Sequence, residues 1–273
     1  MHPCSKDNLT TAPPGLFCGI GVGPGMPGLI PVAAWDFLQT CDVILLPRAK
    51  SANRSVARSC LPLHQIPETR FREIEFAMES DRALLTGNYS RLADEIGQEV
   101  SAGKKVAYLT IGDPLTYSTY IYLFRALQER FPELPCRTYP GVTSYCALAA
   151  VTGFALGEGK EQVLILPCPN DMHELRHLID AHDIVILLKI GERLADVLQL
   201  LEDMEIGDQC SFGAHVGMEN EVVSIGISDL TKTNSGYLST MLIRKKPAES
   251  RRPAMTNRRQ QPTIYEDTFN NQP

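Results

Sequence analysis

Three glycines in the stretch GVGPGMPG, residues 21–28, have the spacing of a loop that binds phosphate. Gly23, Gly25 and Gly28 match the pattern G-x-G-x-x-G of dinucleotide-binding loops, and an apolar run precedes them. Two prolines inside the stretch remove backbone N–H groups that such a loop would have to donate. The alternative is a tight turn after a first strand, with no ligand.

A second candidate is Asp113, which stands between Gly112 and Pro114 at the end of the apolar run 106–111. Parallel sheets place their ligands at the carboxyl ends of strands, so a carboxylate here suits a ligand-binding role. An aspartate at this place also suits a plain turn or helix cap. The residues alone leave both interpretations open.

Five short segments follow one another along the chain in a fixed order. They are VGPG (22–25), YLTIGDPLTYST (108–119), YPGVTS (139–144), ILLKIG (186–191) and YLSTMLIRK (237–245). This series resembles the tetrapyrrole methylases, and within them it looks most like the C20-methyltransferases of precorrin-2 or its cobalt form. The resemblance covers about residues 15–246. It implies an S-adenosylmethionine-dependent methyltransferase of cobalamin biosynthesis and a turn, not a pyrophosphate site, at residues 21–28.

The resemblance also implies which residues line the pocket of the methyl donor. They are Pro24, Gly112, Asp113, Thr116, Tyr117, Ser118, Thr143, Ser144, Leu188, Ala214 and Leu238. Methyl transfer from a sulfonium mainly requires that donor and acceptor be held in line, so no catalytic residue is assigned and no protein-bound metal is expected. Thr143 and Ser144 have a plain alternative, since hydroxyls before a helix usually cap it.

A macrocycle with several carboxylates needs a local positive surface, although the net charge of the chain is -6. The segment 47–58 supplies one, and we expect Arg48, Lys50 and Arg54 to bind the substrate carboxylates, with Arg58, Arg70 and Arg72 as further candidates. An ordinary solvated surface is the alternative. Arg48 would also suit the 2′-phosphate of NADP.

The chain departs from the usual family pattern at four positions. Met26 stands where an aspartate is usual, Gly28 and Pro31 replace residues that are more often acidic or threonine, and Ala77 replaces a common proline. Two other functions therefore stay open. One is an NADP-dependent reductase that uses the glycine loop, and the other is a relative that binds the tetrapyrrole without turnover.

Apolar runs alternate with segments of helical periodicity along most of the chain, which predicts an α/β protein. We expect two αβα domains, the first with a mostly parallel sheet and the second with a mixed one. The first domain would span residues 16–134 and the second 135–246. Residues 1–15 would form a flexible arm and residues 247–273 a disordered tail.

The composition of the chain argues against several further classes of protein. The net charge of -6 argues against nucleic acid as a main partner, and no run is apolar enough for a membrane span. The eight cysteines form no C-x-x-C pair, which is typical of reduced core thiols in a cytoplasmic protein. His173, His177 and His182 are interpreted as a solvated helix face rather than a metal site. The resemblance also implies a homodimer.

Overall fold

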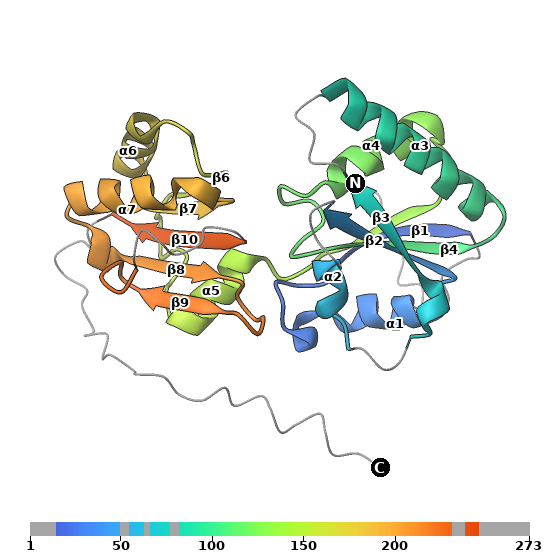
Figure 1. Ribbon diagram of the computed structural model, residues 1–273, viewed down its shortest axis with the longest axis horizontal. Helices are drawn as coiled ribbons and strands as arrows, with labels where there is room; N and C mark the ends of the chain where they lie inside the picture. The colour runs from blue at the N-terminus through green and yellow to red at the C-terminus, as the bar shows by residue number, and fades with distance from the viewer. Residues whose placement is uncertain (1–14, 50–54, 63–65, 77–81, 231–237, 246–273) are drawn as a thin grey trace, which may run out of the picture.

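Short apolar runs form the strands of two separate sheets, each with five strands (Figure 1). The computed structural model describes residues 15–49, 55–62, 66–76, 82–230 and 238–245. Residues 1–14 of the expected arm, the expected tail, Lys50, Arg54 and Ala77 lie outside these residues, whereas Gly15 is described and its N–H donates to the carbonyl of Gly103. The predicted α/β fold, with one parallel and one mixed sheet, is confirmed.

The first sheet is parallel throughout, because every pair of neighbouring strands has parallel register. Its strands, in order across the sheet, are β3 (Phe71–Phe76), β2 (Val43–Ala49), β4 (Lys105–Thr110), β1 (Leu16–Gly21) and β5 (Cys136–Tyr139). Strand β1 is buried along its whole length, as is expected where helices cover both faces of a parallel sheet.

Helices cover both faces of this sheet. On one face lie α1 (Val32–Thr40) and α2 (Val56–Ser59), and on the other lie α3 (Arg82–Ser101) and α4 (Tyr120–Arg130). The alternating side chains of β1 divide between these layers: Cys18 and Ile20 pack with α1, whereas Phe17 packs with α3 and α4. The strand pleat therefore feeds two hydrophobic cores at once.

The second sheet is mixed. Its strands, in order, are β6 (Val163–Pro167), β7 (Ile184–Leu188), β10 (Ser239–Arg244), β8 (Cys210–Ala214) and β9 (Val222–Ile225). Only β6 and β7 pair in parallel, and the other pairs are antiparallel. No helix intervenes along the chain between β8, β9 and β10 in the described residues, which is why these strands can pair antiparallel.

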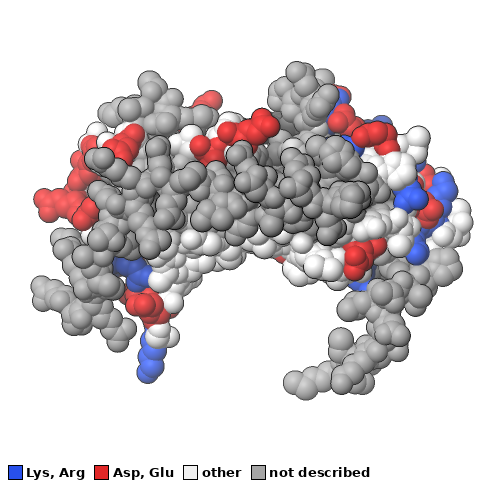
Figure 2. Space-filling model, turned by 90° about the horizontal axis from the view of Figure 1, so that it is seen from below, with Lys and Arg blue, Asp and Glu red and all other residues white. Residues whose placement is uncertain are grey.

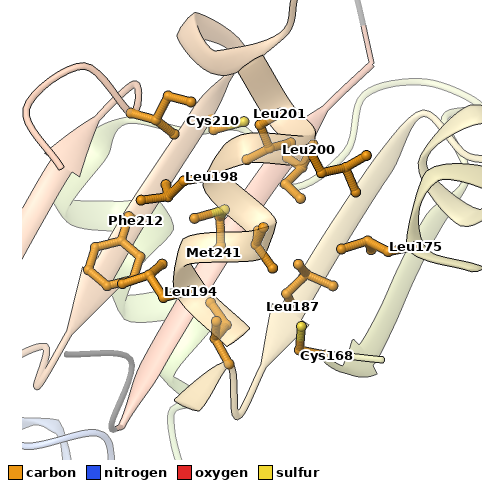
Figure 3. Packing of buried hydrophobic residues seen from close by; sticks show 14 of the residues in the cluster. Cys168, Leu175, Leu187, Leu194, Leu198, Leu200, Leu201, Cys210, Phe212 and Met241 are labelled. Atoms are coloured by element: carbon orange, nitrogen blue, oxygen red, sulfur yellow. The ribbon is translucent and has the colours of Figure 1, made fainter. Parts of the chain in front are cut away.

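One face of the second sheet is covered by α5 (Ser144–Thr152) and the other by α6 (Met172–Ala181) and α7 (Leu194–Asp203). Figure 3 shows the larger core, where Leu194, Leu198 and Leu201 of α7 lie over Phe212 of β8 and Met241 of β10. The helix repeats an apolar residue every three or four positions, so one face packs on the sheet.

Two features differ from the expectations. Strand β3 was not predicted, and β5 pairs with β1 in the first sheet although the expected boundary at residues 134 and 135 assigned it to the second domain. The chain leaves the first sheet only after Tyr139, and we propose the domain boundary there.

The described cysteines are free thiols, and five of them are buried. Burial raises the pKa of Cys60 to about 11 and that of Cys210 to about 12, so these thiols stay protonated at neutral pH. Cys146 is exposed and Cys136 is half-buried, so the expectation of core thiols fails for these two. None of the helices in the described ranges is long and apolar enough to cross a membrane.

Charges of both signs lie over both halves of the molecule. Figure 2 shows this from below, with further acidic side chains visible near the middle of the upper edge. Among the described residues visible on this face, Lys and Arg form no large continuous surface of the kind that suits a nucleic-acid backbone.

The glycine loop joins the two sheet units. A side-chain carbon added at Gly25 would lie 2.7 Å from the carbonyl oxygen of Val216 and 2.7 Å from Cγ of Met218, both beyond the end of β8. At Gly28, in the same loop, an added carbon would meet nothing within 4 Å. Gly25 is thus needed for the close approach of two backbones, and Gly28 is not.

We predict that Gly25→Ala lowers the free energy of unfolding by about 1–3 kcal/mol, because the new methyl group must displace backbone of the other unit. Gly28→Ala is the matched control and should stay within about 0.5 kcal/mol of the parent protein. Urea denaturation followed by fluorescence measures both. Equal stability of the two variants would contradict the close contact at Gly25.

Candidate active site

The carboxyl ends of β1 and β4 form the switch point of the first sheet. The two strands are neighbours, yet β1 leads to α1 on one face and β4 leads to α4 on the other. Connections that part in this way leave a crevice at the strand ends, where open α/β sheets bind ligands. In Figure 1 the arrow of β2, which is parallel to both, points toward the second sheet, so the crevice faces that unit.

Three chain segments meet at this edge with almost no space between them. The N–H of Gly112 donates to the carbonyl of Gly23 at 2.7 Å, and the two residues form an isolated bridge. A side-chain carbon added at Gly141 would lie 2.0 Å from the carbonyl oxygen of Gly112. Only glycine fits at residue 141, and the ends of β1, β4 and β5 are therefore packed backbone to backbone.

The carboxylate of Asp113 ties these segments together. Its Oδ1 accepts hydrogen bonds from the N–H of Leu115 at 2.9 Å and from Oγ1 of Thr116 at 3.1 Å, which makes it a turn aspartate. Its Oδ2 accepts from the N–H of Gly141 at 3.1 Å, across to the segment after β5. Asp113 therefore stabilises a local turn, and the same carboxylate also fixes two loops relative to each other.

The second sheet supplies the opposite wall through its strand register. Strand β10 is antiparallel to β7 and β8, so its first residues lie beside the last residues of those strands. Thr240 is opposite Leu188, and Ser239 is opposite Ala214. Segments that are distant in the sequence are thus brought to one edge of the sheet.

A cavity of about 520 Å³ lies between the two edges. This volume is within the roughly 300–1,000 Å³ that is common for small-molecule sites. Of the eleven residues expected around a donor, all except Ala214 line the cavity. Ala214 is buried in β8, one residue before the lining residue His215. The structure brings these residues together, and their binding of a donor stays a prediction.

The two hydroxyl residues before α5 have different roles. Thr143 caps the helix, with Oγ1 accepting from the N–H of Cys146 at 3.4 Å. Ser144 does not cap it, because its Oγ is paired with Oγ1 of Thr240 at 2.7 Å. This pair links α5 to β10 at the cavity wall.

The cavity has eleven further lining residues that the sequence did not indicate: Thr110, Ile111, Thr119, Tyr145, Lys189, Gly191, His215, Val216, Met218, Ser239 and Thr240. Ile111, Lys189 and His215 directly follow a strand, and each stands next to a residue that was expected. The rule that ligands lie at the carboxyl ends of strands would have found these three if it had been extended to the first residue after each strand.

Four lining residues other than glycine have a left-handed backbone. Their φ angles are 52° at Tyr117, 53° at Lys189, 53° at His215 and 47° at Leu238, and the fifth such residue of the described chain is Glu205. Such conformations cost about 1–2 kcal/mol each and gather where a binding site constrains the backbone. Their gathering here supports a binding role for the cavity.

A family model described as Tetrapyrrole (Corrin/Porphyrin) Methylases matches residues 17–229. The chain belongs to the tetrapyrrole methylase family. The cobalt-precorrin-2 C(20)-methyltransferase of Salmonella typhimurium is 30% identical over 187 residues, which cover 68% of this chain and 78% of that protein. The probable cobalt-precorrin-2 C(20)-methyltransferase of Methanocaldococcus jannaschii is 30% identical over 232 residues, 83% and 95% of the two chains.

Solved structures share the fold of this tetrapyrrole methylase. A cobalt precorrin-4 methyltransferase aligns with a TM-score of 0.62 at 17% identity, over 84% of this chain and 94% of that one. A uroporphyrin-III C-methyl transferase from Thermus thermophilus, solved with S-adenyl homocysteine, aligns with a TM-score of 0.54 at 16% identity, over 85% and 98%.

The described part of the basic segment does not line the cavity of this tetrapyrrole methylase. Nε of Arg48 lies 3.0 Å from the carboxylate of Glu73, and its Nη2 lies 3.0 Å from that of Glu75. Arg58 is paired with Glu68 and lies over the ring of Phe71. Of the guanidinium groups that were expected to meet the substrate, those of Arg48 and Arg58 are thus already paired within the protein.

The two later arginines lie at the opposite edge of the first sheet. Arg70 donates to the carbonyl of Gln39 at the end of α1, and Arg72 pairs with Glu99 at the end of α3. Both helices run back from the carboxyl edge, so their ends mark the amino edge. A role of these arginines at the cavity is therefore excluded by their place in the fold.

Two large aromatic side chains and the histidines at residues 173, 177 and 182 lie apart from the cavity. Tyr120 is buried in the first core and Trp35 packs at the edge of the other. Among the described residues, no three His, Cys, Asp or Glu side chains are grouped so that they could hold a metal ion. His182 makes a hydrogen bond from its ring to the carbonyl of Leu178.

We predict that Asp113→Ala weakens binding of S-adenosylhomocysteine at least tenfold and lowers the free energy of unfolding by about 1–3 kcal/mol, because three donors lose a charged acceptor. Asp171→Ala is the control, since Asp171 accepts from the N–H of His173 at the start of α6, away from the cavity. That variant should lose about 1 kcal/mol of stability and bind normally. Calorimetric titration and urea denaturation measure the two quantities, and equal binding by both variants would contradict the role of Asp113.

Proposed function

We propose that the chain is an S-adenosylmethionine-dependent C-methyltransferase that acts at C20 of precorrin-2 or cobalt-factor II in cobalamin biosynthesis. The observation that carries the proposal is the gathering of the expected donor residues around one cavity between the two sheets. Membership of the tetrapyrrole methylases and the names of the two relatives support the substrate. A homodimer and a cytoplasmic location are part of the same proposal.

The work of this protein is to position its two substrates. S-adenosylmethionine supplies an activated methyl group: its carbon–sulfur bond breaks as the new carbon–carbon bond forms, and the macrocycle carbon then loses its proton. Side chains such as Leu188 and Leu238 offer apolar contact to the donor, whereas the hydroxyls of Thr116 and Thr143 offer hydrogen bonds. The backbone contacts around Asp113 keep these groups fixed, and holding the reactants within about 3–3.5 Å and in line supplies most of the catalysis.

The reductase alternative is not favoured by the geometry. The glycine loop passes into a short 3-10 helix, Pro27–Leu29, and only then into α1, so its glycines do not stand at the N-terminus of a long helix. Arg48 faces two glutamates, whose charges oppose a 2′-phosphate. The non-catalytic alternative rests on the altered residues Met26, Gly28 and Ala77, and it is decided by turnover. The backbone of Met26 packs against Gly217 beyond β8.

We predict that S-adenosylhomocysteine binds with micromolar affinity and that NADPH does not bind, both measured by calorimetric titration of the full chain. If S-adenosylhomocysteine does not bind and NADPH does, the protein is the reductase instead. Binding without transfer of a labelled methyl group to precorrin-2 or cobalt-factor II would identify a non-catalytic relative. Comparison of kcat/KM for these two acceptors then identifies the substrate.

A further inference from the structure

The guanidinium of Arg193 binds the backbone of two loops in the second unit. Its Nε donates to the carbonyl of Ile190 at 2.9 Å and its Nη2 to that of Lys189 at 2.6 Å, both in the turn after β7. Its Nη1 donates to the carbonyl of Cys168 and to Oδ1 of Asn170, both at 2.8 Å, in the segment after β6. One side chain thus joins the loops that follow two neighbouring parallel strands.

The turn that Arg193 holds has an unfavourable backbone. Lys189 has a φ of 53°, in the left-handed region that a lysine rarely adopts, and Gly191 follows with a φ of 60°. A side chain other than glycine persists there only where its surroundings fix the backbone. Arg193 supplies such contacts, because it binds the carbonyls of residues 189 and 190. The direction in which the lysine side chain leaves the second sheet therefore depends on Arg193.

The side chain of Lys189 reaches the loop that follows β4 in the first unit. Its Nζ donates to the carbonyl of Tyr117 at 2.9 Å. The phenol of Tyr117 donates to the carbonyl of Ile165 in β6 at 2.8 Å. This loop of the first unit is thus attached to the second sheet at two points, and both involve Tyr117.

The two neighbours of Tyr117 in the chain are bonded within the first unit instead. Oγ1 of Thr116 donates to Asp113 at 3.1 Å, and Oγ of Ser118 is paired with Oγ1 of Thr110 at 2.9 Å. Residues 116–118 all line the cavity between the sheets. A shift of the central residue would move its neighbours as well, because the three share one backbone.

We infer that Arg193 is a positioning residue for the methyl donor: it fixes the backbone of Lys189, whose side chain then holds the loop at residues 113–118 in place. The inference rests on the proposed function, since it needs a methyl donor in the cavity. Arg193 is not among the described residues that line the cavity. An effect of its substitution on ligand affinity therefore passes through the residues that it holds.

The test is calorimetric titration of S-adenosylhomocysteine into the full chain. We expect Arg193→Gln to weaken binding about tenfold, because the turn after β7 loses the contacts that fix Lys189. Arg193→Lys keeps the charge but has no planar fork to bind both loops, so it should bind about as weakly. Partial unfolding of a variant would instead lower the number of binding sites and leave the affinity of each site unchanged.

A double-mutant cycle tests the route through Lys189. Lys189→Met removes the bond to Tyr117, keeps a long side chain and should itself weaken binding. Adding Arg193→Gln to Lys189→Met should weaken binding by less than about threefold more, since residues that act in series are not additive. Two losses that multiply in full would show that Arg193 acts by another route and would overturn the inference.

Arg244→Gln is the matched control. Arg244 also donates to a backbone carbonyl, that of Ala155 at 2.7 Å, and it pairs with Glu161. It is the last residue of β10, whose first residue, Ser239, borders the cavity, so it lies at the opposite edge of the second sheet. We expect this variant to lose stability and to keep the affinity of the parent protein.

The outcomes separate the positioning role from the proposed function. Parent affinity in Arg193→Gln, or equal weakening in Arg193→Gln and Arg244→Gln, overturns the positioning role alone. A parent protein that does not bind S-adenosylhomocysteine overturns the proposed function, and the positioning role with it.

Discussion

The packing of three strand ends around Asp113 is the constraint on which the site depends. Backbone groups at Gly23, Gly112 and Gly141 approach so closely that a side chain at residue 141 would overlap a carbonyl oxygen. The carboxylate of Asp113 then joins the loop after β4 to the segment after β5. That segment leads directly to Thr143 and α5, so the same contact sets how the chain enters the second unit.

The second unit forms the opposite wall of the cavity. Its antiparallel β10 brings Leu238 to the edge where β7 and β8 end, and the left-handed backbones of Lys189 and His215 follow those strands. Their strain is held in place by contacts between the units, such as Tyr117 with Ile165 and Gly25 with Val216. Strain of this kind persists only where the surrounding structure fixes the backbone, which explains why it gathers between the sheets.

Much of the fold could be predicted from the sequence because buried parallel strands are continuous apolar runs, as in residues 43–46 and 184–188. Strand β3 was not predicted because it is an edge strand with the sequence FREIEF, and its charged residues interrupt the apolar run that marks a buried strand. The short β5 was not assigned to the first sheet because its pairing with β1 joins segments that are distant in the sequence. Ten donor-pocket candidates could be named because the resemblance to a family implies them, and the fold brings them to one cavity where strand ends converge.

The sequence alone could not predict which basic side chains are available to a ligand. Arg48 stands opposite Glu75 in the register of β2 and β3, and that pairing decides whether its charge is available. The number of cations in a segment does not reveal which residues of the neighbouring strand they face. In a protein with a net charge of -6, the availability of a cation for a ligand carboxylate therefore depends on its ion pairs in the fold, rather than on how many cations a segment contains.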